Sequence, residues 1–349
     1  MRTMALLTIS AVLMAAFAAT PASANVHAGT VAADKGDFPA ALSAWSASAK
    51  SGDAEAQYKL GLLLISGKAG KADIASGMNW LRRAALSGHP QAANALGMIY
   101  YSGAASSVKQ DRARAYRAFE MAANKGHVGA QFSLGVMLMN GDGIAKDQGL
   151  ALDWLIKAAN QNHVPAQYKL GNFYATGSGD QKSPEQALSW YLKAATNGFV
   201  AAQLAVAKMK MNGEGSPINL PEAITWYRWA ADGGNAEAQY ALGLFDYLGA
   251  AKERDSVQAI KWFELAAKGG NRNAQYNLGK IYSAGDGVPA DMFEAYKWFY
   301  LATSSAHDEA RYYLASLAAK MSQEAIASAT AAALAWSEAN RPSVRKPST

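Results

Sequence analysis

The sequence predicts an all-α protein, a right-handed α-solenoid of about seven stacked helix–loop–helix repeats with terminal capping helices. Three observations predict this fold: a leucine–glycine pair that recurs in register, a tryptophan row with the same step, and a glycine-containing loop between them. Successive glycines of the pairs are 36, 38, 36, 72 and 36 residues apart, and Val206-Ala207 marks a degenerate copy at the midpoint of the longest gap. The pairs are Leu60-Gly61, Leu96-Gly97, Leu134-Gly135, Leu170-Gly171, Leu242-Gly243 and Leu278-Gly279.

The first helix of each repeat is predicted from an alanine that lies four residues before the leucine position. Residues four apart share one face of a helix, and the glycine beside the leucine lets a neighbouring helix approach closely. We therefore expect these residues to form the buried stripe of the first helix. The alanines are Ala56, Ala92, Ala130, Ala166, Ala202, Ala238, Ala274 and Ala310.

The second helix of each repeat is predicted from a tryptophan that is followed four residues later by a small residue. The second copy breaks the row, with Ala118 in the frame and Phe119 beside it. One helical hairpin of this kind cannot bury its apolar face alone, so stacked neighbours must share a continuous core. The tryptophans are Trp80, Trp154, Trp190, Trp226, Trp262 and Trp298.

The loop between the two helices contains a glycine that can take a positive φ and end the first helix. A residue with a short polar side chain follows, and it can accept hydrogen bonds from the free amides that open the second helix. Because the type of this residue is kept while its identity changes, capping explains the row and catalysis does not. The glycines are Gly67, Gly103, Gly141, Gly177, Gly213, Gly249 and Gly285, and the caps are Asp73, Asp111, Asp147, Ser183, Asn219, Asp255 and Asp291.

The first 24 residues have the layout of a cleavable secretory signal peptide. Arg2 precedes an apolar run from Ala5 to Ala18, and the small residues Ala22-Ser23-Ala24 predict a cut after Ala24. The alternative is a membrane anchor, but a spanning helix needs roughly 20 apolar residues and this run is shorter. We therefore expect a periplasmic or secreted chain without a membrane span.

The remaining boundaries follow the repeat. Residues 25–52 form a lead-in and a half-repeat, in which a lone second helix surrounds Trp45, and residues 53–306 form the seven full repeats. Residues 307–339 form a second half-repeat and a helix that closes the last unit. The basic tail 340–349 is polar and is predicted to be disordered.

Composition excludes several classes of protein. Cysteine is absent, which excludes disulfides, thiolate metal sites and cysteine nucleophiles. The formal net charge is +6, and the basic residues are scattered, whereas nucleic-acid binding needs a concentrated basic face. We expect no cofactor and no nucleic-acid partner, and the modest basicity at most favours anionic partners.

The unit A-x-x-x-L-G-x-x-Y-x-x-G-x-G-x-x-x-D, followed by W-x-x-x-A-A-x-x-G, resembles the Sel1-like repeat, a relative of the tetratricopeptide repeat. The clearest copy spans 273–303, and the chain departs from the pattern at Leu64, Leu138, Asp246 and Ala207. The resemblance implies an α-solenoid that acts as an adaptor, assembling complexes or holding a partner in check. Several bacterial members work in the periplasm, in signalling, regulation of envelope polysaccharide or contact with a host.

In solenoids of this kind the first helices line the concave groove, where binding commonly occurs. An aromatic residue recurs two positions after the repeat alanine, and the residue four positions further on varies while sharing its face. These aromatics either hold a peptide together with their variable neighbours or only brace adjacent repeats, and both interpretations stay open. The groove candidates are Tyr58, Phe132, Tyr168, Asn172, Lys208, Tyr240, Tyr276, Lys280 and Tyr312.

A second candidate surface lies three residues after the tryptophan, where basic residues in early repeats give way to Trp229, Leu265 and Leu301. If exposed, these side chains form an apolar strip suited to a partner or to self-association. If the closing helix or local packing covers them, they belong to the core, which is the interpretation that we favour.

Three patterns that suggest chemistry do not support it. His89, His127 and His163 recur at one turn position, but stacked hairpins advance by about 10 Å. Zinc ligands lie only about 2.1 Å from the metal, so we expect solvated turn histidines and no metal site. The matches to S-x-x-K at 106–109 and 343–346 lack their companion motifs, and the Gly-x-Gly loops open no βαβ unit.

The sequence therefore predicts a non-catalytic periplasmic scaffold that binds a protein partner through the groove. The resemblance adds a role in envelope signalling or polysaccharide production. The alternative is an envelope-binding module for peptidoglycan or acidic glycan. A hydrolase acting on cell-wall or β-lactam substrates is the least favoured, because no acid–base pair or nucleophile–base set stands out.

Overall fold

The computed structural model describes residues 21–103, 108–177, 182–250, 253–304 and 308–340. Over these residues the chain is helical and contains no strand, which confirms the predicted all-α repeat fold. The chain divides into two compact units, residues 1–163 and residues 164–349, and each is described by itself. Most of the predicted signal peptide (residues 1–20), the tail 341–349, and both serines of the S-x-x-K matches lie outside the described residues.

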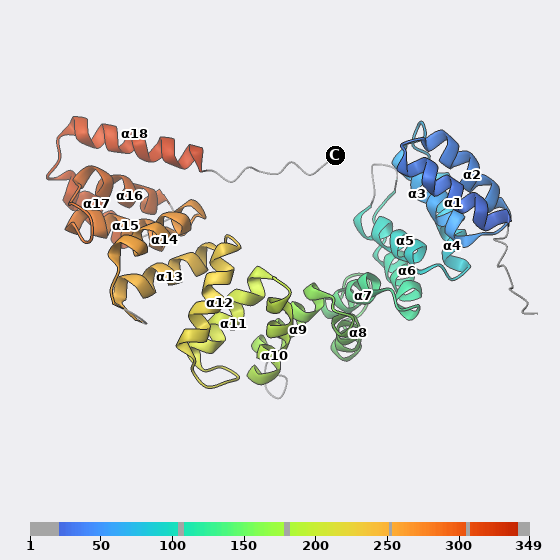
Figure 1. Ribbon diagram of the computed structural model, residues 1–349, viewed down its shortest axis with the longest axis horizontal. Coiled ribbons are helices and arrows are strands. Elements are labelled where there is room, and N and C mark those ends of the chain that lie inside the picture. Colours follow the sequence, from blue (N-terminus) through green and yellow to red (C-terminus); the bar gives the residue numbers. More distant parts are fainter. Residues whose placement is uncertain (1–20, 104–107, 178–181, 251–252, 305–307, 341–349) are drawn as a thin grey trace, which may run out of the picture. The chain divides into compact units, whose positions relative to one another are not determined.

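In each unit, consecutive helices pair through short loops and stack on the next pair, apart from α17 and α18 at the C-terminal end (Figure 1). Unit 1 contains α1 (Pro21–Asp34), α2 (Phe38–Lys50), α3 (Ala54–Ser66), α4 (Ile74–Leu86), α5 (Pro90–Ser102), α6 (Arg112–Asn124), α7 (Val128–Asn140) and α8 (Gln148–Asn160). Unit 2 contains α9 (Val164–Thr176), α10 (Pro184–Thr196), α11 (Val200–Asn212), α12 (Leu220–Asp232), α13 (Ala236–Leu248), α14 (Ser256–Lys268), α15 (Arg272–Ala284), α16 (Met292–Ser304), α17 (Asp308–Ala318) and α18 (Gln323–Ala339). The degenerate copy keeps the regular form, since α11 and α12 have 13 residues each, like α13 and α14.

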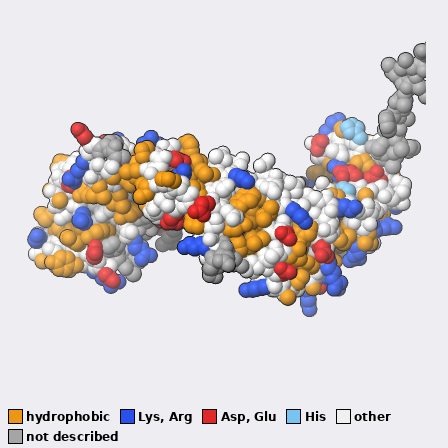
Figure 2. Space-filling view, turned by 90° about the horizontal axis from the view of Figure 1, so that it is seen from below, with side chains coloured by type: hydrophobic (Ala, Val, Ile, Leu, Met, Phe, Trp, Pro, Cys, Tyr) orange, Lys and Arg blue, Asp and Glu red, His pale blue; other side chains and the backbone are white. Residues whose placement is uncertain are grey.

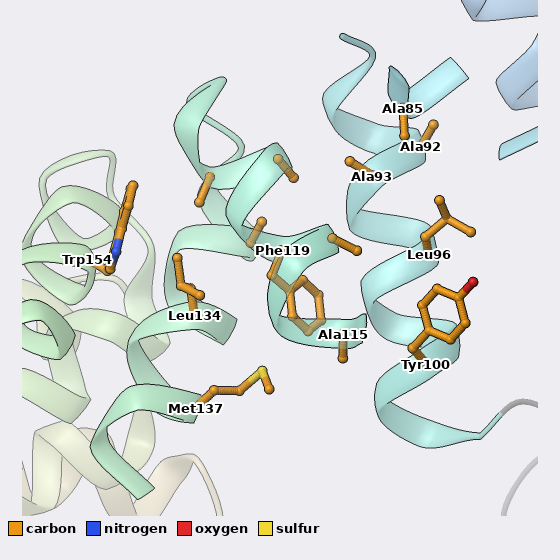
Figure 3. Close-up of a cluster of buried hydrophobic side chains, with 14 of the residues drawn as sticks. Ala85, Ala92, Ala93, Leu96, Tyr100, Ala115, Phe119, Leu134, Met137 and Trp154 are labelled. Atoms are coloured by element: carbon orange, nitrogen blue, oxygen red, sulfur yellow. The ribbon is translucent and has the colours of Figure 1, made fainter. Parts of the chain in front are cut away.

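The core repeats with the sequence. All eight alanines of the first-helix row are fully buried. The side chain that faces the glycine of each leucine–glycine pair is the residue directly after the tryptophan position, as Phe119 shows in the core of unit 1 (Figure 3). The second copy is therefore regular, because Phe119 occupies the same place as Phe263 and Phe299. The residues of this row are Leu81, Phe119, Leu155, Tyr191, Tyr227, Phe263 and Phe299.

The predicted caps are confirmed. The side chain of Asp111 accepts a hydrogen bond from the backbone amide of Arg114, and all seven predicted cap residues make the equivalent bond. At the other end of the loop, Gly141 has φ +77° and closes α7 in the left-handed conformation. Such a conformation favours glycine because it lacks a Cβ.

A row of buried glutamines, which sequence reasoning missed, joins five of the repeats to the helix pair or helix before them. In Gln239, for example, Nε2 donates to the carbonyl of Ala231 at 3.0 Å, which lies in the last turn of the preceding second helix. This bond adds a second donor to a carbonyl at the helix end, which also accepts from the backbone amide of Gly234 at 2.9 Å. Equivalent bonds run from Gln57, Gln131, Gln203 and Gln275 to Ala49, Ala123, Ala195 and Ala267.

Two features at the ends of the chain position the outer surfaces. The helix around Trp45 is not alone as predicted, because α1 packs on it and the Trp45 ring nitrogen donates to the carbonyl of Val26 at 3.2 Å. At the other end, α18 packs mainly on α16 rather than pairing with α17. The ring of Trp336 in α18 meets that of Trp298 in α16 edge-on, with centroids 5.0 Å apart.

Candidate functional site: the faces of the first and second helices

The predicted aromatic row lies on the first helices, and in unit 1 it braces neighbouring repeats. Tyr58 in α3 stacks on the ring of His89, which precedes α5, with centroids 4.8 Å apart. Phe132 makes the same contact with His163, with centroids 4.7 Å apart. Both aromatic side chains are half-buried. The ring contacts support the interpretation that these aromatics brace adjacent repeats.

In unit 2 the row is more varied. Tyr168 contacts the ring of Phe199, with centroids 4.9 Å apart, whereas Tyr240 and Tyr276 approach the buried rings of their own repeats. Tyr312 in α17 differs from the others, because 74% of its surface is exposed. The aromatic row is thus largely engaged within the fold except at its last member.

The variable polar residues of the predicted groove also have internal partners. Asn172 accepts a hydrogen bond from the hydroxyl of Tyr191 at 2.7 Å, and burial raises the pKa of Tyr191 to about 12, which keeps it a donor. Lys208 forms an ion pair with Glu237 of the next repeat at 2.6 Å. Lys280 is exposed and lies 5.7 Å from the centre of the Tyr276 ring. Of the three, Lys280 is the most accessible to a partner.

An apolar hollow of about 200 Å³ lies between the first helices α5 and α7 of unit 1. Met98, whose surface is 52% exposed, stands at its rim, and Val136 and Phe132 line it. Sequence reasoning missed Met98 because its repeat has Asn94 in place of the aromatic. The sequence could have indicated it, because Met98 occupies the variable position of its repeat, equivalent to Leu62 and Val136 in the neighbouring repeats. The remaining lining residues are Tyr101, Phe119, Ser133 and Met137.

Two of the three turn histidines, His89 and His127, are helix caps, and the prediction that the three are solvated was wrong because all are at least half-buried. Nδ1 of His89 accepts from the amide of Ala92 at 3.2 Å, and Nδ1 of His127 accepts from Ala130 at 3.1 Å. Burial lowers the pKa of both His127 and His163, because desolvation disfavours the charged ring. In the described part of the chain, no three His, Asp or Glu side chains are grouped to hold a metal ion.

His89 makes a second contact that fixes its tautomer. Its Nε2 lies 2.8 Å from a carboxylate oxygen of Glu55, and its Nδ1 is the acceptor of the cap. Nε2 must therefore carry the proton and donate it to Glu55. Although burial opposes it, the hydrogen bonds from His89 and Lys59 leave the pKa of Glu55 below its usual value.

The strip on the second helices is only partly as predicted. Trp229 in α12 and Leu265 in α14 are 48% and 43% exposed, so the favoured core interpretation was wrong for them. Leu301 in α16 is 4% exposed and belongs to a cluster with Ala333 of α18, so it is not part of an exposed strip. The physical reason is that α18 packs on α16 and therefore covers Leu301 but neither Trp229 nor Leu265.

A basic cleft of about 550 Å³ lies between α4 and α6, lined by Arg82, Lys109 and Arg114 around Tyr100. Arg114 pairs with Asp111 at 3.2 Å. Among the described residues, no carboxylate lies within 4.0 Å of a nitrogen of Arg82 or Lys109. The arrangement can attract an anion. Elsewhere the charges are mixed, as on the face in Figure 2, where cationic and anionic side chains alternate between hydrophobic patches.

Comparison with known proteins gives one family. The model of the Sel1 repeat matches seven consecutive segments, residues 54–89, 90–127, 128–163, 164–199, 200–235, 236–271 and 272–307. No curated protein matches the chain. None of the described helices combines the length and apolarity needed to cross a membrane.

Two solved structures are similar over most of this chain. One is c5321, a protective antigen present in uropathogenic Escherichia coli strains, with 29% identity and a TM-score of 0.80 over 91% of this chain and 70% of that one. The other is a Sel1 repeat protein from Oxalobacter formigenes, with 30% identity and a TM-score of 0.65 over 85% of this chain and 93% of that one.

Proposed function

The chain belongs to the Sel1 repeat family, and from this membership we propose that it is a non-catalytic periplasmic scaffold that binds a protein through the first helices of unit 1. Proteins of the family generally serve as scaffolds for protein interactions, and their fold is typically non-enzymatic. A role in envelope signalling or polysaccharide production belongs to the same proposal.

The observation that carries the proposal is the apolar hollow between α5 and α7. Its volume of about 200 Å³ is below the roughly 300–1,000 Å³ of pockets for small molecules. The hollow therefore suits one apolar side chain of a protein partner better than a whole small ligand. Leu62 on α3, which is 38% exposed, adds apolar surface on the first helix of the preceding repeat.

A photo-crosslinking residue placed at Met98 tests this proposal in the native periplasm. We expect a protein adduct that excess unlabelled wild-type chain removes, whereas excess Val136→Asp chain does not. The matched control places the same residue at Leu150, which is exposed on the second helix α8. Equal adducts at both positions, or equal competition by the Val136→Asp chain, would contradict a site in the hollow.

The export part of the proposal rests on the N-terminal sequence. A cut after Ala24 removes the first residues of α1 but keeps Val26, whose carbonyl accepts the Trp45 hydrogen bond. The similar Escherichia coli protein is a protective antigen, which agrees with an exported chain. N-terminal sequencing of the protein from a periplasmic fraction should begin at Asn25, and an uncleaved cytoplasmic chain would contradict export.

The basic cleft favours a second candidate function, an envelope-binding module for peptidoglycan or an acidic glycan. Arg82, Lys109 and Arg114 gather positive charge at one place on the surface. Co-sedimentation with purified sacculi should then fall as salt rises, since salt screens exposed charges. No pelleting at low salt, or pelleting equal to that of an Arg82→Gln/Lys109→Gln chain, would dismiss this candidate.

A further inference from the structure

We infer that the outer face of repeats five and six, formed by Trp229 of α12 and Leu265 of α14, docks an amphipathic helix of a partner protein that carries an alanine seam. This surface is separate from the hollow between α5 and α7, and it does not depend on the proposed function. Both residues lie three positions after the tryptophan of their second helix. In several other repeats a cation occupies this position, in the last repeat α18 covers it, and in repeats five and six it is apolar and exposed.

In three earlier repeats the position three residues after the tryptophan holds a cation over the indole ring. Arg83, Lys157 and Lys193 lie 4.8, 4.0 and 3.8 Å from the ring centres of their tryptophans. In each case the charged group lies over the indole ring while the residue as a whole stays exposed to water. In these repeats a charged side chain therefore covers the tryptophan at the surface.

Repeats two, five and six lack this cation; Met121 of repeat two stands alone, whereas repeats five and six are consecutive. Trp229 meets Trp226 edge-on with centroids 4.6 Å apart, and about half of its surface remains exposed. Leu265 is similarly exposed beside the partly buried Trp262. Single exposed apolar residues are ordinary, but these two occupy the same position on the second helices of consecutive repeats, and Trp262 packs against the cluster that contains Trp226.

The last repeat shows what this position accepts. Leu301, at the equivalent position, is covered by α18, whose buried residues Ala329 and Ala333 are four apart on one face. Trp336 of the same helix packs on Trp298 of α16. Small residues let the backbone of α18 approach closely while one aromatic anchors it. The surface of α16 that α18 covers is thus a helix-binding interface within this chain. Leu265 and Trp229 occupy the position of Leu301, 36 and 72 residues earlier.

The occupant we assign is therefore a helix with the pattern of α18: alanines at i and i+4, an aromatic residue three positions later, and a polar outer face. The chain's own α18 is already seated on α16, so the occupant comes from another molecule. Since helices bound in apolar grooves are held by anchors at such spacings, the aromatic and one small residue should dominate its affinity.

A labelled synthetic peptide of residues 322–340 is the probe. Titrated with the full chain and followed by fluorescence anisotropy, it should bind saturably. Trp229→Lys and Leu265→Lys should each weaken binding about tenfold, as expected for a central anchor. These substitutions install the residue that repeats three and four carry at this position, so helicity and the unfolding midpoint should stay close to wild type.

The matched control is Leu248→Lys, which makes the same chemical change at an exposed leucine at the end of α13. It should leave binding unchanged, and a peptide with Ala333→Glu should fail to bind wild-type chain. Absence of binding would overturn the inference. Binding by both Lys variants as tight as that of the wild-type chain would also overturn it, because the peptide would then only exchange with the resident α18. If the wild-type chain dimerises and Trp229→Lys abolishes the dimer, the occupant of this surface is a second copy of the chain and not a helix of a partner protein.

Discussion

Replacing Gly243 by alanine is expected to destabilise unit 2, although alanine is the better helix former. Glycine in a helix interior is about 1 kcal/mol less favourable than alanine. Against this gain, an alanine Cβ would lie 2.6 Å from two ring atoms of Phe263, far inside an ordinary contact of 3.4–4 Å. The ring is fully buried and cannot retreat. Overpacking a core costs about 1–3 kcal/mol, and two contacts this short place the cost at about 2–3 kcal/mol, so we expect a net loss of about 1–2 kcal/mol.

The natural comparison is Ala207, which occupies the same position in the fifth repeat and is fully buried. Ala207→Gly should cost about 1 kcal/mol through helix propensity alone. The opposite substitutions at equivalent positions should therefore both destabilise the protein. This outcome is expected only if each repeat has adjusted its second helix to the residue it carries.

Thermal unfolding followed by circular dichroism measures the effect. For a unit of this size, 1 kcal/mol corresponds to a shift of about 2–4 °C in the midpoint, so Gly243→Ala should lower it by about 2–8 °C. Hydrogen exchange should localise the change to α13, α14 and their neighbours, because each repeat contacts only adjacent repeats. A raised midpoint would refute the reasoning, since helix propensity would then outweigh the contact with Phe263.

Three further predictions concern stability. Gln239→Leu removes one of two donors to the carbonyl of Ala231, which keeps the backbone amide of Gly234 at 2.9 Å, so it should cost about 0.5–1.5 kcal/mol, measured by urea unfolding; an unchanged free energy of unfolding would mean that the side-chain bond adds nothing to stability. Burial lowers the pKa of His127 and His163 below 6.5, so their contribution to stability is complete above pH 6.5 and is lost as pH falls through the folded pKa values. Unfolding midpoints between pH 8 and pH 5 should show this loss, which His127→Asn should reduce; an unchanged profile in that variant would contradict it. Removing residues 322–349 uncovers Leu301 and should increase binding of a hydrophobic dye, and unchanged dye binding would show that α18 does not shield the core.

Sequence reasoning predicted the parts of the fold that repeat. The alanine row, the caps and six of the seven loop glycines were confirmed, because each depends on local geometry that recurs along the chain. Phe119 shows the limit of this reasoning. The tryptophan row drew attention by its rarity, whereas the residue after it, which varies among leucine, phenylalanine and tyrosine, fills the core against the glycine.

The sequence could not predict contacts that occur once. The helix α1 has no repeat pattern and overlaps the predicted signal peptide, so nothing indicated that it packs on Trp45. Whether Leu301 is buried depends on where α18 lies, and α18 does not pair with α17 as a regular second helix would. The partners of Asn172 and Lys208 likewise depend on side-chain positions that spacing alone does not give.

The glutamine-to-carbonyl bond has a consequence for how the chain can change over generations. Because Gln203, Gln239 and Gln275 each hold the preceding helix through the same atoms at the same offset, a junction between any two of these units is chemically interchangeable. Recombination that deletes or duplicates 36 residues in frame would rejoin matching ends without a new seam. Unit number can therefore drift, while the surface carried by each unit travels with it.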